Sequence, residues 1–340
     1  MTDTSFDPVP IRSWRRDLDS YARPRFGRSL LDLATSVVPY LVILAAMFGA
    51  LRVSVWLMLL LVLPASGFLV RSFIVFHDCA HGSFFRSRRA NNLLGAATGL
   101  LVWMPFRGWQ HEHAVHHATS GDLDRRGVGD ITTLTVAEYH ALPSWRRIGY
   151  RLFRNPIVMF GLGWLLVLLI KPRFVPRRAQ KRVRNSVLGT DIALALIVTI
   201  AVLSVGWRDY LLVQGPVFLV SGALGIWLFY VQHQFEDAYW QPHAEWRFDQ
   251  AALAGSSYLK LPRVIQFFTG NIGFHHVHHL CVGIPNYNLP NAHEETEQLR
   301  AVPELTLGDG LRAIRLKLWD EPSNRLVTFR EARAARDSGA

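Results

Sequence analysis

The sequence predicts an all-α integral membrane protein, with four transmembrane helices in two hairpins and a cytoplasmic helical cap. Three observations support this fold: long apolar segments, a one-sided distribution of basic residues, and histidine clusters close to the ends of the segments. The chain has 340 residues, of which 50% are hydrophobic and only 19% are charged. Because a soluble domain carries about 25% charged residues, we expect a single membrane domain over residues 1–340.

Four apolar segments approach or exceed the length of about 20 residues that a helix needs to cross a bilayer. They form two predicted hairpins, 34–51 with 53–76 and 188–206 with 210–231. The first hairpin turns near Arg52, and the second turns at Trp207, Arg208 and Asp209. Two shorter apolar stretches, 93–106 and 156–170, do not reach the length of a span, so we predict interfacial or re-entrant segments there.

The basic residues give the predicted spans an orientation. If the two hairpin turns face outward, only Arg52 and Arg208 among the 37 Lys and Arg residues lie outside. Such a bias is typical of cytoplasmic connections, so we expect the mixed, charged segment from Glu294 onward to form part of a cytoplasmic cap. The net charge of +11 is then a topology signal and does not indicate a nucleic-acid partner. The two cysteines indicate no disulfide framework.

Nine of the 14 histidines form a pattern on the predicted cytoplasmic side. They make one H-x-x-x-H motif, two H-x-x-H-H motifs and one isolated histidine: His77, His81, His113, His116, His117, His233, His275, His278 and His279. Residues at i, i+3 and i+4 share one face of a helix, so each motif presents its imidazoles to one side. Nine imidazoles exceed the needs of one metal ion and suit two ions with four or five ligands each. Imidazole binds iron, copper and zinc alike, and redox chemistry beside a bilayer favours iron.

Several other residues are candidates for supporting roles. Five acidic residues are candidate hydrogen-bond acceptors for metal-binding imidazoles: Asp78, Glu112, Glu236, Asp237 and Asp249. Asn271 is a candidate for positioning water, and His111 and His276 lie off the ligand spacing. His140, His243 and His293 are predicted to be solvated. Six aromatic residues flank the clusters and are candidates to line an apolar tunnel: Trp103, Phe106, Trp109, Phe267, Phe268 and Phe274.

The clusters resemble the three histidine boxes of membrane fatty-acid desaturases. The matching segments are 77–85, 113–117 and 275–279, together with the run 229–237, which is typical of bacterial acyl-lipid members, and Leu318-Trp319-Asp320-Glu321. The resemblance implies a di-iron centre held by the nine histidines. It also implies that O2 and two electrons are used to introduce a cis double bond into a lipid-linked acyl chain. The first box resembles that of the omega-6 and omega-3 branch, because three residues separate its two histidines, and this favours a delta-12/omega-6-like enzyme.

One position departs from the acyl-CoA branch of that superfamily. Those enzymes carry an Asn, which holds a metal-bound water, four residues before the isolated histidine. Phe229 occupies that position here. The resemblance also implies a separate electron donor, because the haem-binding His-Pro-Gly-Gly of a fused cytochrome b5 is absent from the sequence. A small acidic carrier similar to ferredoxin suits the basic cytoplasmic surface, and we expect the enzyme in a bacterial inner membrane.

Alternative functions remain open at this point. A fatty-acid or alkane hydroxylase, or a carotenoid oxygenase, has the same boxes, because desaturation and hydroxylation share the first hydrogen abstraction. A histidine-rich metal transporter needs polar residues that face one another across the spans. The predicted spans offer only Arg71, Asp191 and Gln214. A purely structural membrane protein would leave nine clustered histidines without a purpose.

Overall fold

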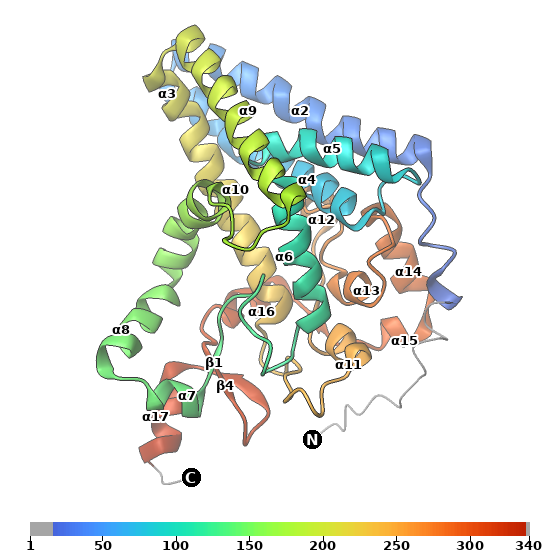
Figure 1. The fold of residues 1–340 in the computed structure, drawn as a ribbon, viewed down its shortest axis with the longest axis vertical. Helices are drawn as coiled ribbons and strands as arrows, with labels where there is room; N and C mark the ends of the chain where they lie inside the picture. The colour runs from blue at the N-terminus through green and yellow to red at the C-terminus, as the bar shows by residue number, and fades with distance from the viewer. Residues whose placement is uncertain (1–15, 338–340) are drawn as a thin grey trace.

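Long helices form one end of the molecule and a cap of short helices and small sheets forms the other (Figure 1). The structure is a computed structural model, and it describes residues 16–337. Four candidate membrane spans lie in this part of the chain: α2 (Phe26–Val53), α3 (Val55–Leu60) continued by α4 (Val62–His81), α9 (Lys181–Val205) and α10 (Trp207–His233). The prediction of a helical membrane protein with four spans is therefore confirmed.

The two hairpin turns lie together at the top of Figure 1, away from the cap. Ser54 separates α2 from α3, and its hydroxyl accepts a hydrogen bond from the backbone N–H of Trp56 at 3.2 Å, which caps the new helix. Gly206 separates α9 from α10 with φ +85°, a conformation that costs glycine little. The prediction that Trp207, Arg208 and Asp209 form the turn is wrong. Because Gly206 alone reverses the chain, these residues begin α10.

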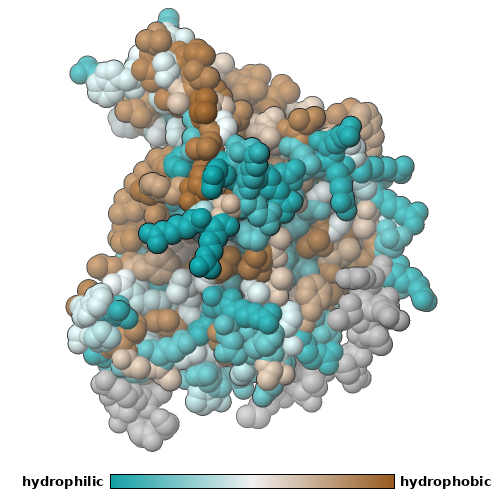
Figure 2. Space-filling model, viewed as in Figure 1, coloured by the Kyte–Doolittle hydropathy of each residue, from teal (hydrophilic) through white to brown (hydrophobic). Residues whose placement is uncertain are grey.

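The outer faces of the long helices are apolar. On α9, Leu188, Ile192, Leu196 and Ile200 recur every fourth residue on one face, and each is between 49% and 64% exposed. Figure 2 shows such hydrophobic surface over the long helices, whereas hydrophilic residues gather nearer the cap. An apolar stripe of this length is unfavourable in water and favourable in hydrocarbon. The chain is therefore a membrane protein.

Helix α4 lies at the centre of the spans and packs against α2, α10 and the next helix, α5 (Arg88–Leu101). The apolar segment predicted to end at residue 76 continues as helix to His81, so the first histidine motif is helical. Gly82 ends α4 in the left-handed conformation, with φ +75°. The predicted interfacial segment 93–106 contains the second half of α5 and the bend before α6 (Phe106–Thr119).

The second predicted interfacial segment, 156–170, forms two π-helical pieces, η1 (Ile157–Leu162) and η2 (Leu165–Ile170), followed by η3 (Lys171–Arg173). Helix α8 (Ser144–Phe153) precedes them at an angle of 62°. This bend is the geometry of a broken or re-entrant span.

Short elements make up the cap. Its helices are α7 (Val136–Ala141), α11 (Phe248–Leu253), α12 (Arg263–Phe268), α13 (His275–Leu280), η4 (Asn286–Asn288), α14 (Leu289–Glu295), α15 (Glu297–Arg300), α16 (Leu307–Ala313) and α17 (Phe329–Asp337). Its strands are β1 (Leu134–Thr135), β2 (Tyr258–Leu259), β3 (Glu304–Leu305), β4 (Leu318–Asp320) and β5 (Arg325–Val327). Strand β4 pairs in parallel with β1 and antiparallel with β5, and β2 pairs in parallel with β3. Strands of two or three residues are too short to show a periodicity in sequence, so these sheets were not predicted.

Candidate metal centre

The nine predicted histidines come from four helices that meet where the spans join the cap. His77 and His81 lie in the last turns of α4, and His233 is the last residue of α10. Helix α6 carries the first H-x-x-H-H motif, and α13 consists almost entirely of the second. All nine are buried except His81, which is half-buried. The structure therefore brings together all nine predicted histidines, including the isolated His233.

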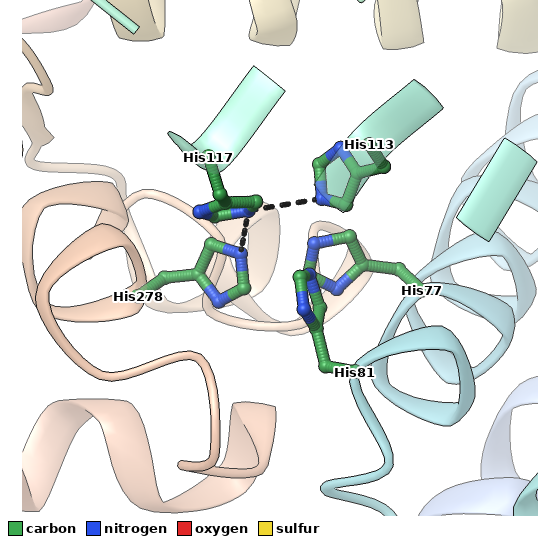
Figure 3. Close-up of side chains that lie close together, drawn as sticks. All are labelled: His77, His81, His113, His117 and His278. Carbon is green, nitrogen blue, oxygen red and sulfur yellow. Dashed lines mark hydrogen bonds between the residues drawn. The ribbon is translucent and has the colours of Figure 1, made fainter. Parts of the chain in front are cut away.

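The nine side chains divide into two groups, and within each group the candidate ligand nitrogens all lie within 4.8 Å of one another. The first group contains His77, His81, His113, His117 and His278, which point toward a common centre in Figure 3. The second group contains His116, His233, His275 and His279. Five and four imidazoles at this spacing suit two metal ions.

Each H-x-x-H-H motif is shared between the two groups. On α6, His113 and His117 belong to the first group and His116 belongs to the second. On α13 the assignment is reversed, because His278 belongs to the first group and His275 and His279 belong to the second. The i, i+4 pair of each helix thus serves one group while the i+3 residue serves the other.

The hydrogen bonds at Nδ1 indicate which nitrogen of three histidines faces its group. Nδ1 of His77 lies 3.1 Å from a carboxylate oxygen of Asp78, and Nδ1 of His233 lies 3.0 Å from the carbonyl oxygen of Gly255. Nδ1 of His116 bonds a carboxylate oxygen of Asp130. An acceptor at Nδ1 holds the proton there and leaves the Nε2 lone pair free to bind a metal. The tautomers follow from these partners.

The facing Nε2 atoms fit a cation between them. Nε2 of His116 lies 3.1 Å from Nε2 of His233, so two nitrogens that both carry lone pairs face each other. In addition, Nε2 of His81 and Nε2 of His279, one in each group, are buried without a hydrogen-bond partner among residues 16–337. A buried polar atom without a partner costs free energy, and a metal ion in each group would remove that cost.

Burial also keeps the imidazoles in the form that binds metal. It holds the pKa values of His113, His117 and His278 well below the ordinary value, and the neighbouring imidazoles add to the effect. The same causes lower the pKa values of His275 and His279. These side chains are therefore neutral near pH 7, with lone pairs available to a metal.

One predicted acceptor and one unforeseen acceptor support the histidines. Asp78 contacts His77 as expected, but three other predicted acids pair with basic side chains: Glu112 with Lys171, Glu236 with Arg325 and Asp249 with Arg247. Asp130, which the sequence analysis missed, accepts from His116. Asp130 lies in a loop 13 residues beyond the second histidine motif, and no spacing rule connects it to His116.

The remaining histidines lie outside the two groups. His111 and His243 are exposed, and His140 is half-buried. The prediction that His293 is solvated is wrong: it is 4% exposed and its Nδ1 lies 3.1 Å from Nε2 of the buried His276. Its ring packs against Tyr258 and Phe274 in the cap, so the pair supports the fold behind α13.

Aromatic side chains cover parts of the centre. The indole of Trp109 stacks on His113 with ring centroids 4.2 Å apart. Phe267 and Phe268 pack on Phe68 of α4. A tunnel through these aromatic residues remains a prediction.

Phe229 lies against the second group, with its ring centroid 5.1 Å from that of His116 and 5.5 Å from that of His233. A small cavity beside it is lined by Asp130, His233 and Tyr239, among others. The second group therefore combines four imidazoles with an adjacent cavity, where the first group has five imidazoles.

Comparison with known proteins identifies the family. A family model described as fatty acid desaturase matches residues 54–306, which include all nine histidines. The chain is 46% identical to a fatty acid desaturase of Bacillus subtilis over 315 residues, which cover 93% of this chain and 90% of the relative. It is 28% identical over 236 residues to the sn-1 oleoyl-lipid 12-desaturase of Synechocystis sp., covering 66% and 64% of the two chains. It is 24% identical over 243 residues to an sn-1 acyl-lipid omega-3 desaturase (ferredoxin) of Nostoc sp., covering 65% and 62%. This chain belongs to the fatty acid desaturase family, and it is an oxidoreductase.

Proposed function

We propose that the protein is an O2-dependent desaturase that introduces a cis double bond into the acyl chain of a membrane lipid, with two iron ions held by the nine histidines. The observation that carries the proposal is the pair of buried, all-imidazole groups that meet at the junction of spans and cap. Iron bound there would supply the oxidising chemistry that an unactivated C–H bond requires. One hydrogen leaves each of two adjacent carbons, and O2 is reduced to two waters with two further electrons and two protons.

The protein's own part in this reaction is to position the chain and to exclude water. The histidine groups are buried under Trp109, Phe229 and the cap helices. A dry, shaped site holds the reacting carbons beside the metal and prevents side reactions. The apolar outer faces of the spans let a lipid-borne chain approach from the bilayer.

The position of the double bond is proposed from the relatives. The Synechocystis sp. relative is named a 12-desaturase that acts on an oleoyl lipid, and the first box has the spacing of the omega-6 and omega-3 branch. We therefore propose a delta-12/omega-6-like product.

A small acidic carrier similar to ferredoxin is the proposed electron donor. A relative is named as ferredoxin-dependent. Exposed basic residues gather between η3 and the first turn of α9: Arg177, Arg178, Lys181, Arg182 and Arg184. Such a surface attracts an acidic partner at a rate that falls as salt is added. Replacing Arg177 and Arg178 with Glu should lower the rate of electron transfer, and a rate insensitive to salt would contradict this partner.

The proposed orientation follows from the basic residues. The segments on either side of the π-helical pieces, 144–154 and 171–184, carry 11 of the 37 Lys and Arg residues, which supports a cytoplasmic position for the cap and the metal centre. In a bacterium this is the inner face of the inner membrane.

Fatty-acid profiling of cells that express the protein with a competent electron donor tests the reaction. The expected product is an acyl chain lighter by about 2 Da in the mass spectrum, in the wild type but not in the His113→Ala variant. His111→Ala is the matched control, because His111 lies on the same helix but is exposed. A gain of about 16 Da would support the hydroxylase alternative, and an unchanged profile would contradict the proposed substrate class.

A further inference from the structure

We propose that a buried polar chain of Asn286, Asp32 and Arg71 orients His77 through Asp78, and so sets the metal affinity of the first histidine group. These residues come from η4, α2 and α4, and none of the three lies in a histidine motif. The inference rests on the proposed function to the extent that it takes two metal ions to be bound. In it, Asn286, Asp32 and Arg71 are positioning residues, because they act through Asp78.

The polar chain connects to the first histidine group at His77. Asp78 accepts from Nδ1 of His77 with one carboxylate oxygen, at 3.1 Å. Its other oxygen accepts twice from Asn286, from the backbone N–H at 2.7 Å and from the side-chain Nδ2 at 2.9 Å. Two donors on one oxygen fix the plane of the carboxylate, and the carboxylate in turn fixes the ring of His77.

Asn286 links this carboxylate to a second one. Its Nδ2 also donates to Asp32 at 2.9 Å, so a single amide nitrogen bridges two buried carboxylates. Within the described part of the chain, its side-chain oxygen has no hydrogen-bond partner. This arrangement fits an amide whose donors serve two negative groups, and it separates charges that would otherwise repel each other.

Arg71 neutralises the carboxylate of Asp32 at the other end of the polar chain. Its guanidinium donates to Asp32 and to the backbone carbonyl of Phe267, and it lies 4.0 Å from the ring centroid of Phe267. One side chain therefore connects α4 to α2 and to α12. An ion pair buried between two candidate membrane spans is costly, and residues of this kind commonly mark functional sites.

Asp78 and the three residues of the polar chain are all shielded from solvent. Asp78 and Asn286 are 2% and 1% exposed, and Asp32 and Arg71 are 6% and 7% exposed. Because little water can reach these groups to replace a lost hydrogen-bond partner, a change at Asn286 is transmitted to Asp78.

The second histidine group has separate support. His116 bonds Asp130 and His233 bonds the carbonyl of Gly255, and neither contact involves the polar chain. The effect of Asn286 should therefore be confined to one of two metal positions. That asymmetry distinguishes a positioning role from a general contribution to folding.

Anaerobic equilibrium dialysis of the purified full-length protein against Fe2+ alone tests the inference. The wild type should bind two ions, and Asn286→Ala should bind one of them about 10- to 100-fold more weakly while the other is unchanged. Mössbauer spectra of the loaded protein should show a change in one of two iron components.

Asn288→Ala is the matched control. Asn288 lies in the same short helix, is 7% exposed, and bonds Tyr21 and Arg25 without contacting Asp78. Both variants should lower the melting temperature, but only Asn286→Ala should change iron binding. If Asn286→Ala does not fold, the milder Asn286→Ser keeps a side-chain donor, its hydroxyl, and should give a smaller shift at the same position.

Two outcomes would overturn this inference: equal iron affinities in the wild type and a folded Asn286 variant, or equal weakening of both ions. A wild type that binds no second ion would instead contradict the proposed function, so the two failures are distinguishable.

Discussion

His117 and His278 lie 161 positions apart in the sequence, and their Nε2 atoms lie 3.0 Å apart. This contact joins α6 to α13 inside the first histidine group, while His116 and His275 join the same two helices inside the second. Neither H-x-x-H-H motif can therefore assemble a metal site alone. Each candidate site forms only when the cap helix α13 has docked against α6 and the ends of the spans.

Paired substitutions should separate the two groups. Replacing His113 and His117 with Ala removes two ligands from the first group, so one iron ion should be lost and the other retained. Replacing the adjacent pair His116 and His117 removes one ligand from each group, so both ions should bind more weakly. Iron content after gel filtration measures the loss of each ion. The same iron loss in both double variants would contradict the division of each H-x-x-H-H motif between the two groups.

Asp130 should support the second group as Asp78 supports the first. Asp130→Asn removes the negative charge that bonds Nδ1–H of His116, so the affinity of the second iron ion should fall about 10- to 100-fold. Asp237→Asn changes an exposed carboxylate and should leave iron binding unchanged. Fe2+ titration of both variants is the measurement, and unaltered binding in Asp130→Asn would show that the contact has no role in affinity.

Lys317 should make stability depend on pH. Burial, with a contribution from Arg154, lowers the pKa of Lys317 from 10.5 to about 7. Between these values the unfolded chain binds the proton that the folded protein has lost, so stability rises with pH across that window. Below pH 7 both states carry the charge, and above 10.5 neither does. Lys317→Met should therefore raise the melting temperature at pH 7 by about 2–4 °C and flatten its rise toward pH 10.

The exposed Lys181 provides the control for this prediction. Lys181→Met should leave both the melting temperature and its pH dependence as they are in the wild type. If Lys317→Met melted with the same pH dependence as the wild type, the lowered pKa would be contradicted.

Labelling of single introduced cysteines should reveal the orientation. Val53 is 79% exposed at the first hairpin turn, and Arg178 is exposed in the basic segment before α9. A membrane-impermeant maleimide should label Val53→Cys in intact cells and Arg178→Cys only after permeabilisation. The reverse pattern would place the metal centre outside the cytoplasm.

Local patterns in the sequence predicted the four spans and the nine histidines, because apolar length and helical spacing are short-range signals. They did not predict how the histidines divide, since His113 and His116 share a helix face and only the docking of α13 assigns them to different groups. Asp130 and Asn286 were missed for a related reason. Their contacts with His116 and Asp78 span 14 and 208 positions, and no periodicity connects them. His293 was predicted to be solvated, whereas tertiary packing buries it.

Metal analysis of the purified protein after anaerobic reconstitution tests the central claim most directly. We expect two iron ions per chain, held by nitrogen and oxygen ligands without sulfur. A single ion per chain, or a stable preference for zinc over iron, would contradict the assignment of the two histidine groups to a di-iron centre.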